Sequence, residues 1–306
     1  MRVIDFHAHY FGRVFFETLA AQSPLEGDVE SKLSRLVERT GLQLPSANNA
    51  EHARRWISEL DRNQVDHMCT FASVPEEVPA VVEAARESNG RLSAFAIVDP
   101  RVDGAAAKVR TLLEKRAIRG VLLFPAMHHY AIGGSAAKPL LDALDEHAGV
   151  CFVHCGVLVV KLRDLLKLPR PQDLAYADPL AIVPAASAHP RVSFVIPHFG
   201  AGFFRETLMT GVSAANVFVD TSSSNGWRAT QWPKPTLSEV FARTLEVFGH
   251  ERILFGTDSN TFPAGWRRDR FEEQHAALRT LGTSVAAEEA IFAGNARRIL
   301  GLPDSA

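Results

Sequence analysis

The sequence predicts a (β/α)8 TIM barrel that forms a single domain over residues 1–306, and three observations favour this fold class. The chain has 306 residues, enough for the ~250 residues that such a barrel commonly needs. Short apolar runs alternate with amphipathic segments, and this strand–helix unit recurs eight times. Most of the apolar runs are continuous rather than alternating, which is typical of parallel strands buried on both faces.

The eight predicted strands are short and rich in Val, Ile, Leu and Phe. In chain order they cover residues 3–6, 65–71, 92–98, 120–124, 150–153, 192–196, 217–219 and 253–255. Eight units of this kind favour a closed barrel over an open parallel sheet.

Amphipathic segments with helix-forming composition occupy most of the intervals between these strands. The predicted helices cover residues 50–63, 76–89, 104–115, 138–147, 179–188 and 237–248. Two further segments, 267–281 and 286–300, are predicted as terminal helices that pack back on the barrel.

Three insertions interrupt this rhythm, at residues 10–49, 157–178 and 222–236. They follow strands one, five and seven. Because each comes after a strand, all three are expected over the same face of the barrel, where active sites of such barrels lie. No linker, low-complexity tract or internal repeat divides the sequence.

The composition excludes several kinds of partner. The formal net charge is −2 and no long run of Lys and Arg occurs, which argues against nucleic acid or a membrane surface. No segment approaches the ~20 apolar residues of a membrane-spanning helix, and no secretory signal is recognisable. Three cysteines in apolar runs suit a reducing compartment. We therefore expect a cytoplasmic protein whose partner is a small-molecule substrate, with a homo-oligomer left open by analogy to other barrels.

Two histidines end the first predicted strand in the sequence Asp5-Phe-His7-Ala-His9. Residues two apart in an extended strand point to the same side, so His7 and His9 can both face the barrel interior. They could offer two imidazoles to one metal ion. Such a pair also arises by chance, and either histidine could be structural.

Three other strand ends carry residues that bind metals. His154 ends strand five, His198 ends strand six, and Asp258 follows strand eight. A lone buried His is usually structural, and a lone Asp after a strand usually caps the next helix. Four strand ends that all carry such residues favour a metal site. Two to three histidines with one carboxylate suit Zn²⁺ or another divalent transition metal with a position open for water.

These motifs resemble a known group of enzymes. The segments DFHAH, VHCG, PHFG and FGTDS are similar to those of the amidohydrolase superfamily. They are most similar to its amidohydrolase-related branch, which includes the aminocarboxymuconate-semialdehyde decarboxylase-like enzymes. The resemblance spans Asp5 to Asp258 and the helices that follow, so it covers nearly the whole chain.

The resemblance implies a metal held by His7, His9, His154 and Asp258. It also implies that His198 orients or deprotonates the metal-bound water and that Asp258 acts as a proton shuttle. The expected cofactor is one divalent transition metal, Zn²⁺ first and Mn²⁺ as the alternative.

Strand four departs from part of the superfamily. Some members hold two metals bridged by a carboxylated Lys at the end of this strand. Here residues 120–125 read GVLLFP, with neither Lys nor Glu. The sequence therefore predicts one metal rather than two.

Several side chains in the predicted active-site loops suit a flat, carboxylated substrate. Arg205 follows the glycine-rich segment after strand six, Asn225 and Trp227 lie in the strand-seven insertion, and Arg267 follows strand eight. Aromatic rings could stack on the substrate and guanidinium groups could bind its carboxylate. The alternative is that these side chains only pack the loops or face solvent.

The leading functional hypothesis is hydrolysis of an amide, ester or lactone of a small, carboxylated substrate by a metal-activated water. The rival is non-oxidative decarboxylation of an unsaturated or aromatic carboxylic acid, which would use the same ligands. A third hypothesis, from another class, is a catalytically silent barrel that binds a metal or ligand. The motifs do not separate hydrolysis from decarboxylation, and they do not identify the substrate.

Overall fold

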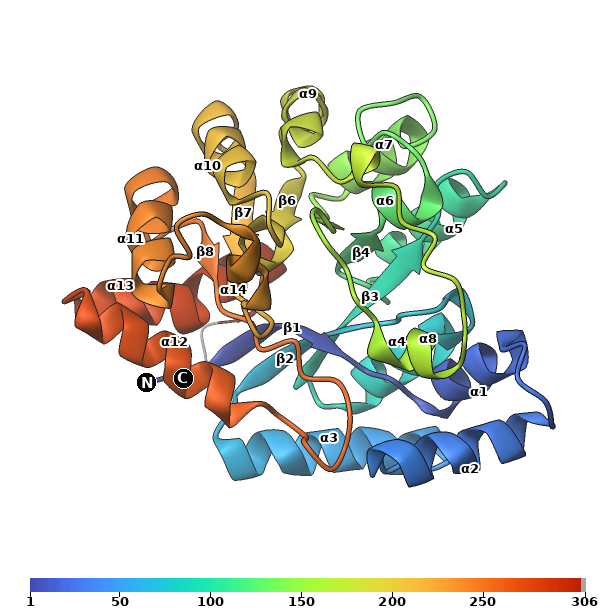
Figure 1. The fold of residues 1–306 in the computed structure, drawn as a ribbon. Helices are drawn as coiled ribbons and strands as arrows, with labels where there is room; N and C mark the ends of the chain where they lie inside the picture. Colours follow the sequence, from blue (N-terminus) through green and yellow to red (C-terminus); the bar gives the residue numbers. More distant parts are fainter. Residues whose placement is uncertain (304–306) are drawn as a thin grey trace.

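The structure, a computed structural model, describes residues 1–303 and confirms the predicted (β/α)8 TIM barrel (Figure 1). Its eight strands are all parallel and follow one another in chain order around the sheet. They are β1 Ile4–His9, β2 His67–Phe71, β3 Leu92–Val98, β4 Gly120–Leu123, β5 Val150–Val153, β6 Ser193–Ile196, β7 Val217–Asp220 and β8 Ile253–Leu254.

The first and last strands close the barrel through backbone hydrogen bonds. The amide of Phe6 donates to Phe255 at 2.8 Å, that of Asp258 donates to His7 at 2.9 Å, and that of His9 donates to Ser259 at 2.7 Å. The closure therefore lies beside the two histidines of β1. It brings the chain after β8 next to them.

The helices agree in position with those predicted, with some differences. They are α1 Arg13–Gln22, α2 Val29–Thr40, α3 Asn49–Asn63, α4 Val78–Glu87, α5 Ala105–Glu114, α6 Pro125–His128, α7 Lys138–Glu146, α8 Lys161–Leu165, α9 Ile182–Ala188, α10 Phe204–Ser213, α11 Leu237–Phe248, α12 Arg268–Thr280, α13 Val285–Glu289 and α14 Asn295–Leu300. The predicted segment 286–300 is not one continuous α-helix, because a π-helical turn separates α13 from α14. The segment between β1 and α3 contains two helices, α1 and α2.

Aromatic side chains fill the barrel beneath the functional end. Phe6, Phe71, Phe95 and Phe152 are fully buried, and their ring centroids lie 4.7–6.2 Å apart. Burying each ring contributes about 1.5–3 kcal/mol to stability. The ring of His7 lies 4.7 Å from Phe71, so this aromatic layer supports the site from below.

A second apolar cluster joins the segment after β1 to the segment after β5. It contains Phe15 and Leu19 of α1, together with Leu166 and Leu168, which follow α8. The hydroxyl of Ser23 also donates to the carbonyl of Leu166 at 2.7 Å. The β5 segment therefore crosses to the β1 side, where α8 lies next to α1 (Figure 1).

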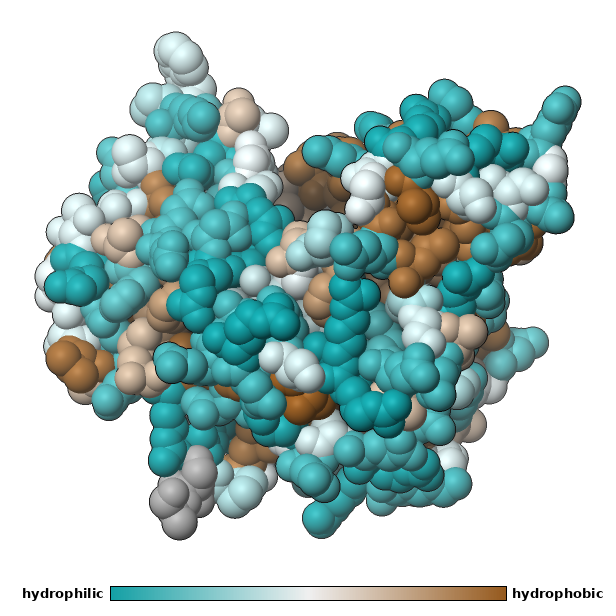
Figure 2. All heavy atoms as spheres, turned by 90° about the horizontal axis from the view of Figure 1, so that it is seen from below, coloured by the Kyte–Doolittle hydropathy of each residue, from teal (hydrophilic) through white to brown (hydrophobic). Residues whose placement is uncertain are grey.

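No helix among residues 1–303 is long and apolar enough to cross a membrane. Seen from below, the molecular surface is mostly hydrophilic, and hydrophobic side chains gather in a few separate areas (Figure 2).

Candidate metal centre and active site

Three predicted metal ligands meet where β1 joins the chain after β8. The carboxylate oxygen Oδ1 of Asp258 lies 3.3 Å from Nε2 of His9 and 3.8 Å from Nε2 of His7. The ligand atoms of these three residues all lie within 4.8 Å of one another. Asp258 reaches this position with a left-handed backbone, φ 60°, and its backbone amide donates a hydrogen bond to the carbonyl of His7. The arrangement suits one cation between two imidazoles and a carboxylate.

His154 lies outside this group of three but faces the same cavity. Its amide donates to Leu123 at 2.9 Å, and its ring stacks on Phe124 and lies 5.4 Å from the ring of His198. Its Nε2 is buried without a hydrogen-bond partner among the described residues. Burial, followed by the nearby His198, lowers the pKa of His154 to about 3. An unpaired, neutral imidazole nitrogen is the form that binds a metal.

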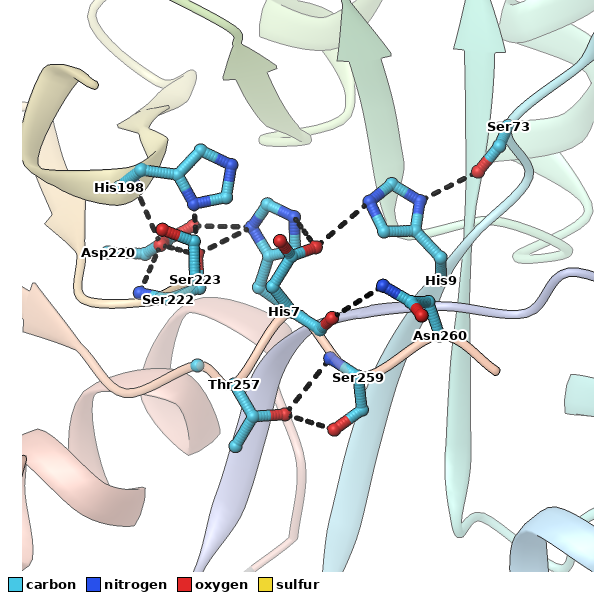
Figure 3. Close-up of polar contacts among 12 residues, drawn as sticks. His7, His9, Ser73, His198, Asp220, Ser222, Ser223, Thr257, Ser259 and Asn260 are labelled. Atoms are coloured by element: carbon cyan, nitrogen blue, oxygen red, sulfur yellow. Dashed lines mark hydrogen bonds and ion pairs between the residues drawn. The ribbon is translucent and has the colours of Figure 1, made fainter. Parts of the chain in front are cut away.

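A second cluster lies on the other side of His7 and contains a residue that the sequence analysis missed, Asp220. Its Oδ2 lies 2.7 Å from Nδ1 of His7, and its Oδ1 accepts the backbone amides of His198 at 3.1 Å and Ser222 at 2.9 Å. Figure 3 shows His7 between this cluster and His9. Asp220 ends β7, so the criterion used for His154, His198 and Asp258 could have found it.

The hydroxyl of Ser222 determines which nitrogen of His198 carries the proton. Ser222 Oγ makes a short contact with Asp220 Oδ1 and lies 2.8 Å from His198 Nδ1. An ionised carboxylate only accepts, so the single hydroxyl proton goes to Asp220. The serine oxygen can therefore only accept a hydrogen bond from His198. The proton of the neutral imidazole accordingly lies on Nδ1. The Nε2 of neutral His198 is left as a proton acceptor.

The charges at the site are set by burial and by these contacts. Burial raises the pKa of Asp220, but His7, together with His198 and Ser222, holds this pKa below the ordinary value. For Asp258, burial also raises the pKa, while the hydrogen bond from His9 and the nearby His198 lower it well below its usual range. Burial lowers the pKa of His198. The site therefore contains two ionised carboxylates and a neutral His198 near pH 7.

His9 is held from behind by a separate set of contacts. Its Nδ1 lies 2.7 Å from the hydroxyl of Ser73, which directs Nε2 towards Asp258. Glu77 is fully buried and accepts the amide of Ser73 at 2.8 Å and that of Gly12 at 2.6 Å. Burial raises the pKa of Glu77 to about 8. These contacts connect the ends of β1 and β2. Neither Ser73 nor Glu77 was found by sequence reasoning.

The site opens into a cavity of about 1080 Å³. His7, His9, His154, His198 and Asp258 all line it. Phe11, which has a positive φ of 43°, also lines the cavity, and its ring lies 5.1 Å from the ring of His9. Residues Leu122 and Phe124 of the β4 region line the wall where a bridging Lys would be expected. The described residues contain two candidate ligand groups that share His7: one with His9 and Asp258, the other with His198 and Asp220. The mononuclear site stays a prediction.

The four predicted substrate-binding residues occupy different surroundings. Trp227 and Arg267 line the cavity, and Arg267 is half-buried and paired with Asp269 at 2.7 Å. Arg205 does not line it, because its exposed side chain points to solvent and bonds Glu206.

Asn225 lies behind the cavity wall. Its side chain is buried, its Oδ1 accepts from the indole of Trp227 at 3.1 Å, and its Nδ2 has no partner among the described residues. The contact with Trp227 indicates that Asn225 orients that ring.

The barrel and its cluster of histidines and carboxylates at the carboxyl end of the strands define an enzyme active site that could hold a metal. The sequence model of the Amidohydrolase family matches residues 4–302, so the chain belongs to this family. The superfamily predicted from the motifs is thereby confirmed. Enzymes of this family bind a divalent metal, and His7, His9 and Asp258 could hold one here. No curated protein sequence matches the chain.

Solved structures of similar fold include both decarboxylases and hydrolases. The 5-carboxyvanillate decarboxylase LigW from Sphingomonas paucimobilis has 13% identity over 99% of each chain, with a TM-score of 0.64. A probable 2-pyrone-4,6-dicarboxylic acid hydrolase from Acinetobacter baumannii, with citric acid bound, has 14% identity over 99% of this chain and 100% of that chain, with a TM-score of 0.62. A dihydroxybenzoic acid decarboxylase from Polaromonas sp. JS666, with bound manganese and 2-nitroresorcinol, has 14% identity over 99% of this chain and 98% of that chain, with a TM-score of 0.64. At these identities the likeness shows the fold alone.

Proposed function

We propose that the chain is a mononuclear metal-dependent hydrolase, which adds water to the carbonyl carbon of an amide, ester or lactone in a small carboxylated substrate. The observation that carries this proposal is the proton arrangement around His198. Ser222 and Asp220 fix the proton on Nδ1, so Nε2 can accept a proton from a water in the cavity. A base positioned in this way is what hydrolysis requires.

The donor set fits a divalent transition metal. His7, His9, His154 and Asp258 would hold it, and the buried, unpaired Nε2 of His154 supports this assignment. Nitrogen and oxygen ligands of this kind favour Zn²⁺, with Mn²⁺ as the alternative. When bound, such an ion lowers the pKa of a water and polarises a carbonyl oxygen.

The side chains divide the remaining tasks. His198 takes the proton of the attacking water at Nε2, and the same nitrogen can return it to the leaving oxygen or nitrogen as the carbon–heteroatom bond breaks. Asp220, 2.7 Å from His7, holds the ring of His7 and stabilises positive charge on the histidines. Trp227 and Arg267 line the cavity where the substrate would lie.

Decarboxylation is the second candidate, and the cavity wall favours it. Phe11, Phe15, Phe124 and Trp227 line the cavity, which suits a flat aromatic ring. Two of the similar structures described above are named decarboxylases of aromatic acids. Against it, Asp258 is ionised and His198 is a proton acceptor, whereas protonation of a ring carbon needs a donor.

The first test is elemental analysis of the protein purified without chelator or added metal. We expect about one transition metal per chain. Two metals would contradict the mononuclear site, and none, with no rebinding of Zn²⁺ or Mn²⁺, would contradict the metal-dependent enzyme. His7→Ala and Asp258→Ala should each lose the metal and keep the fold.

The second test separates the two reactions. The metal-loaded protein is incubated with 2-pyrone-4,6-dicarboxylate, a lactone, and with 5-carboxyvanillate and 2,6-dihydroxybenzoate, two carboxylated aromatics. Incorporation of ¹⁸O from labelled water into the lactone product supports hydrolysis, and release of carbon dioxide supports decarboxylation. His198→Asn should keep the metal and lose turnover. His189→Asn, at a buried histidine paired with Asp142 outside the site, is the matched control.

A further inference from the structure

The segment after β5 forms one wall of the active-site cavity. Residues 157–163 all line it, and Leu166 and Leu168 anchor the segment in the apolar cluster shared with α1 and α2. The amide of Val157 also donates to Ala201 at 2.9 Å. This wall, which we call the β5 wall, is therefore held at both ends, and the side chains on it have defined places in the cavity.

Arg163 and Lys161 are the cations of the β5 wall that line the cavity, and no acidic partner is found for either among the described residues; Lys161 is exposed, whereas Arg163 is half-buried. The Nε and Nη2 of the Arg163 guanidinium donate to the carbonyl of Pro169 at 3.2 and 3.1 Å. Burial lowers the pKa of this guanidinium. A partly desolvated cation with donors left over costs free energy unless an anion pairs with it.

The remaining basic residues of the cavity differ from Arg163. Arg267 pairs with Asp269, and Arg270 lies 3.2 Å from Glu273. Among the described residues that line the cavity, Asp258 is the one acid, against four cations including the exposed Lys161. Because Arg267 and Arg270 are paired, the charges of Arg163 and Lys161 are those that attract anions into the cavity.

We propose that Arg163 binds an anionic group of the substrate, and that Arg163 and Arg267 together make the cavity select dicarboxylates over monocarboxylates. The two guanidinium groups come from different segments that line the same cavity, Arg163 from α8 after β5 and Arg267 from the chain after β8. Arg163 uses Nε and Nη2 towards Pro169, and Arg267 uses the same two nitrogens towards Asp269, so each would bind a substrate carboxylate with its remaining Nη donors. The inference rests on the proposed active site, but it does not depend on which reaction takes place there.

Isothermal titration calorimetry of the protein with its bound metal tests this proposal without turnover. The probes are benzene-1,3-dicarboxylate and benzoate, which share one ring and differ by one carboxylate. The wild type should bind the dicarboxylate about ten-fold or more tightly than benzoate. In Arg163→Gln that preference should fall to about two-fold or less, while affinity for benzoate changes little. Arg163→Lys should give an intermediate preference, because lysine keeps the positive charge but lacks the planar guanidinium group with its paired N–H donors.

Arg170→Gln is the matched control. Arg170 lies on the same segment, but it is exposed, pairs with Asp164 at 2.8 Å and does not line the cavity. Its replacement should leave the preference unchanged. If Arg163 only supports its own loop, Arg163→Gln will weaken both probes by the same factor, and that result overturns the proposal.

Two further outcomes also overturn it: a wild type without preference for the dicarboxylate, and an Arg163→Gln variant that keeps the preference. Failure of the proposed function is a separate result. A protein that hydrolyses nothing but shows the Arg163-dependent preference contradicts the hydrolase and leaves the anion site standing.

Discussion

Ser222 connects His198 to Asp220, with its hydroxyl 2.8 Å from Nδ1 of the histidine and in short contact with a carboxylate oxygen of the aspartate. The same carboxylate holds His7 through its other oxygen, at 2.7 Å. One buried acid thus orients both a proposed metal ligand and the proposed base. The rings of His7 and His198 lie 4.8 Å apart, and these contacts explain how one can bind a metal while the other accepts a proton.

Replacing Ser222 by alanine should disturb His198 without removing the metal. The Nδ1 proton then loses its acceptor, so the ring no longer favours one tautomer and turnover should fall about ten-fold. Histidine ¹⁵N chemical shifts should show a mixture of tautomers, and metal content should stay at the wild-type value. Ser213→Ala, at an exposed serine that does not line the cavity, is the control. An unchanged tautomer in Ser222→Ala would remove Ser222 from this role.

Asp220→Asn should weaken metal binding. The amide is the same size as the carboxylate but carries a donor in place of one acceptor, so it cannot satisfy His7, His198 and Ser222 together. Loss of such a supporting contact typically costs about 10–100-fold in metal affinity. Competition with a chromophoric chelator measures the metal affinity of the variant and of the wild type. Asp142→Asn alters another Asp–His pair, 3.1 Å apart and outside the site, and should leave metal affinity unchanged.

The barrel and most residues of the candidate metal site could be located from the sequence because both follow local rules. Continuous apolar runs mark parallel strands, and the carboxyl ends of those strands meet on one face. His7, His9 and Asp258 therefore come together although His9 and Asp258 are 249 positions apart in the sequence. Asp220 directly follows the predicted strand 217–219, so the same rule applied to that strand would have identified it.

Other features depend on contacts that the sequence does not contain. Ser73 lies in a loop of ordinary composition, and only the packing of β1 against β2 places it 2.7 Å from His9. Arg205 and Arg267 both follow strand ends, but the structure directs Arg205 to solvent and Arg267 into the cavity. Arg163 lies in an insertion that was expected over the active-site face. Its position depends on the packing of the β5 wall against α1, which the sequence does not reveal.

Ser73→Ala should lower metal affinity through His9. The serine hydroxyl is the partner of Nδ1, and without it the ring is free to rotate and Nε2 is directed less well towards the site. We expect affinity to fall about ten-fold, measured by chelator competition, with the fold retained. Ser93→Ala removes a similar buried contact, to His67 at 2.9 Å, away from the site. Equal affinities for the Ser73 and Ser93 variants would contradict a positioning role for Ser73.

The stability of the fold should fall on acidification through His67, at the start of β2. This ring is buried between the carbonyl of Gly90, 2.7 Å from Nδ1, and the hydroxyl of Ser93. Burial lowers its pKa from 6.5 to about 4. Between those values the unfolded chain binds a proton that the folded protein does not. The contribution of neutral His67 is therefore complete above pH 6.5 and is lost as the pH falls towards 4.

This loss amounts to about 3 kcal/mol, because each pKa unit corresponds to ~1.4 kcal/mol. Urea unfolding of the metal-free protein between pH 7 and pH 4 measures the effect. His67→Gln removes the titrating group, so its stability should depend less steeply on pH, even if its stability at pH 7 is lower. His147→Gln, at an exposed position, should follow the wild-type curve. Parallel curves for the wild type and His67→Gln would show that another group causes the acid sensitivity.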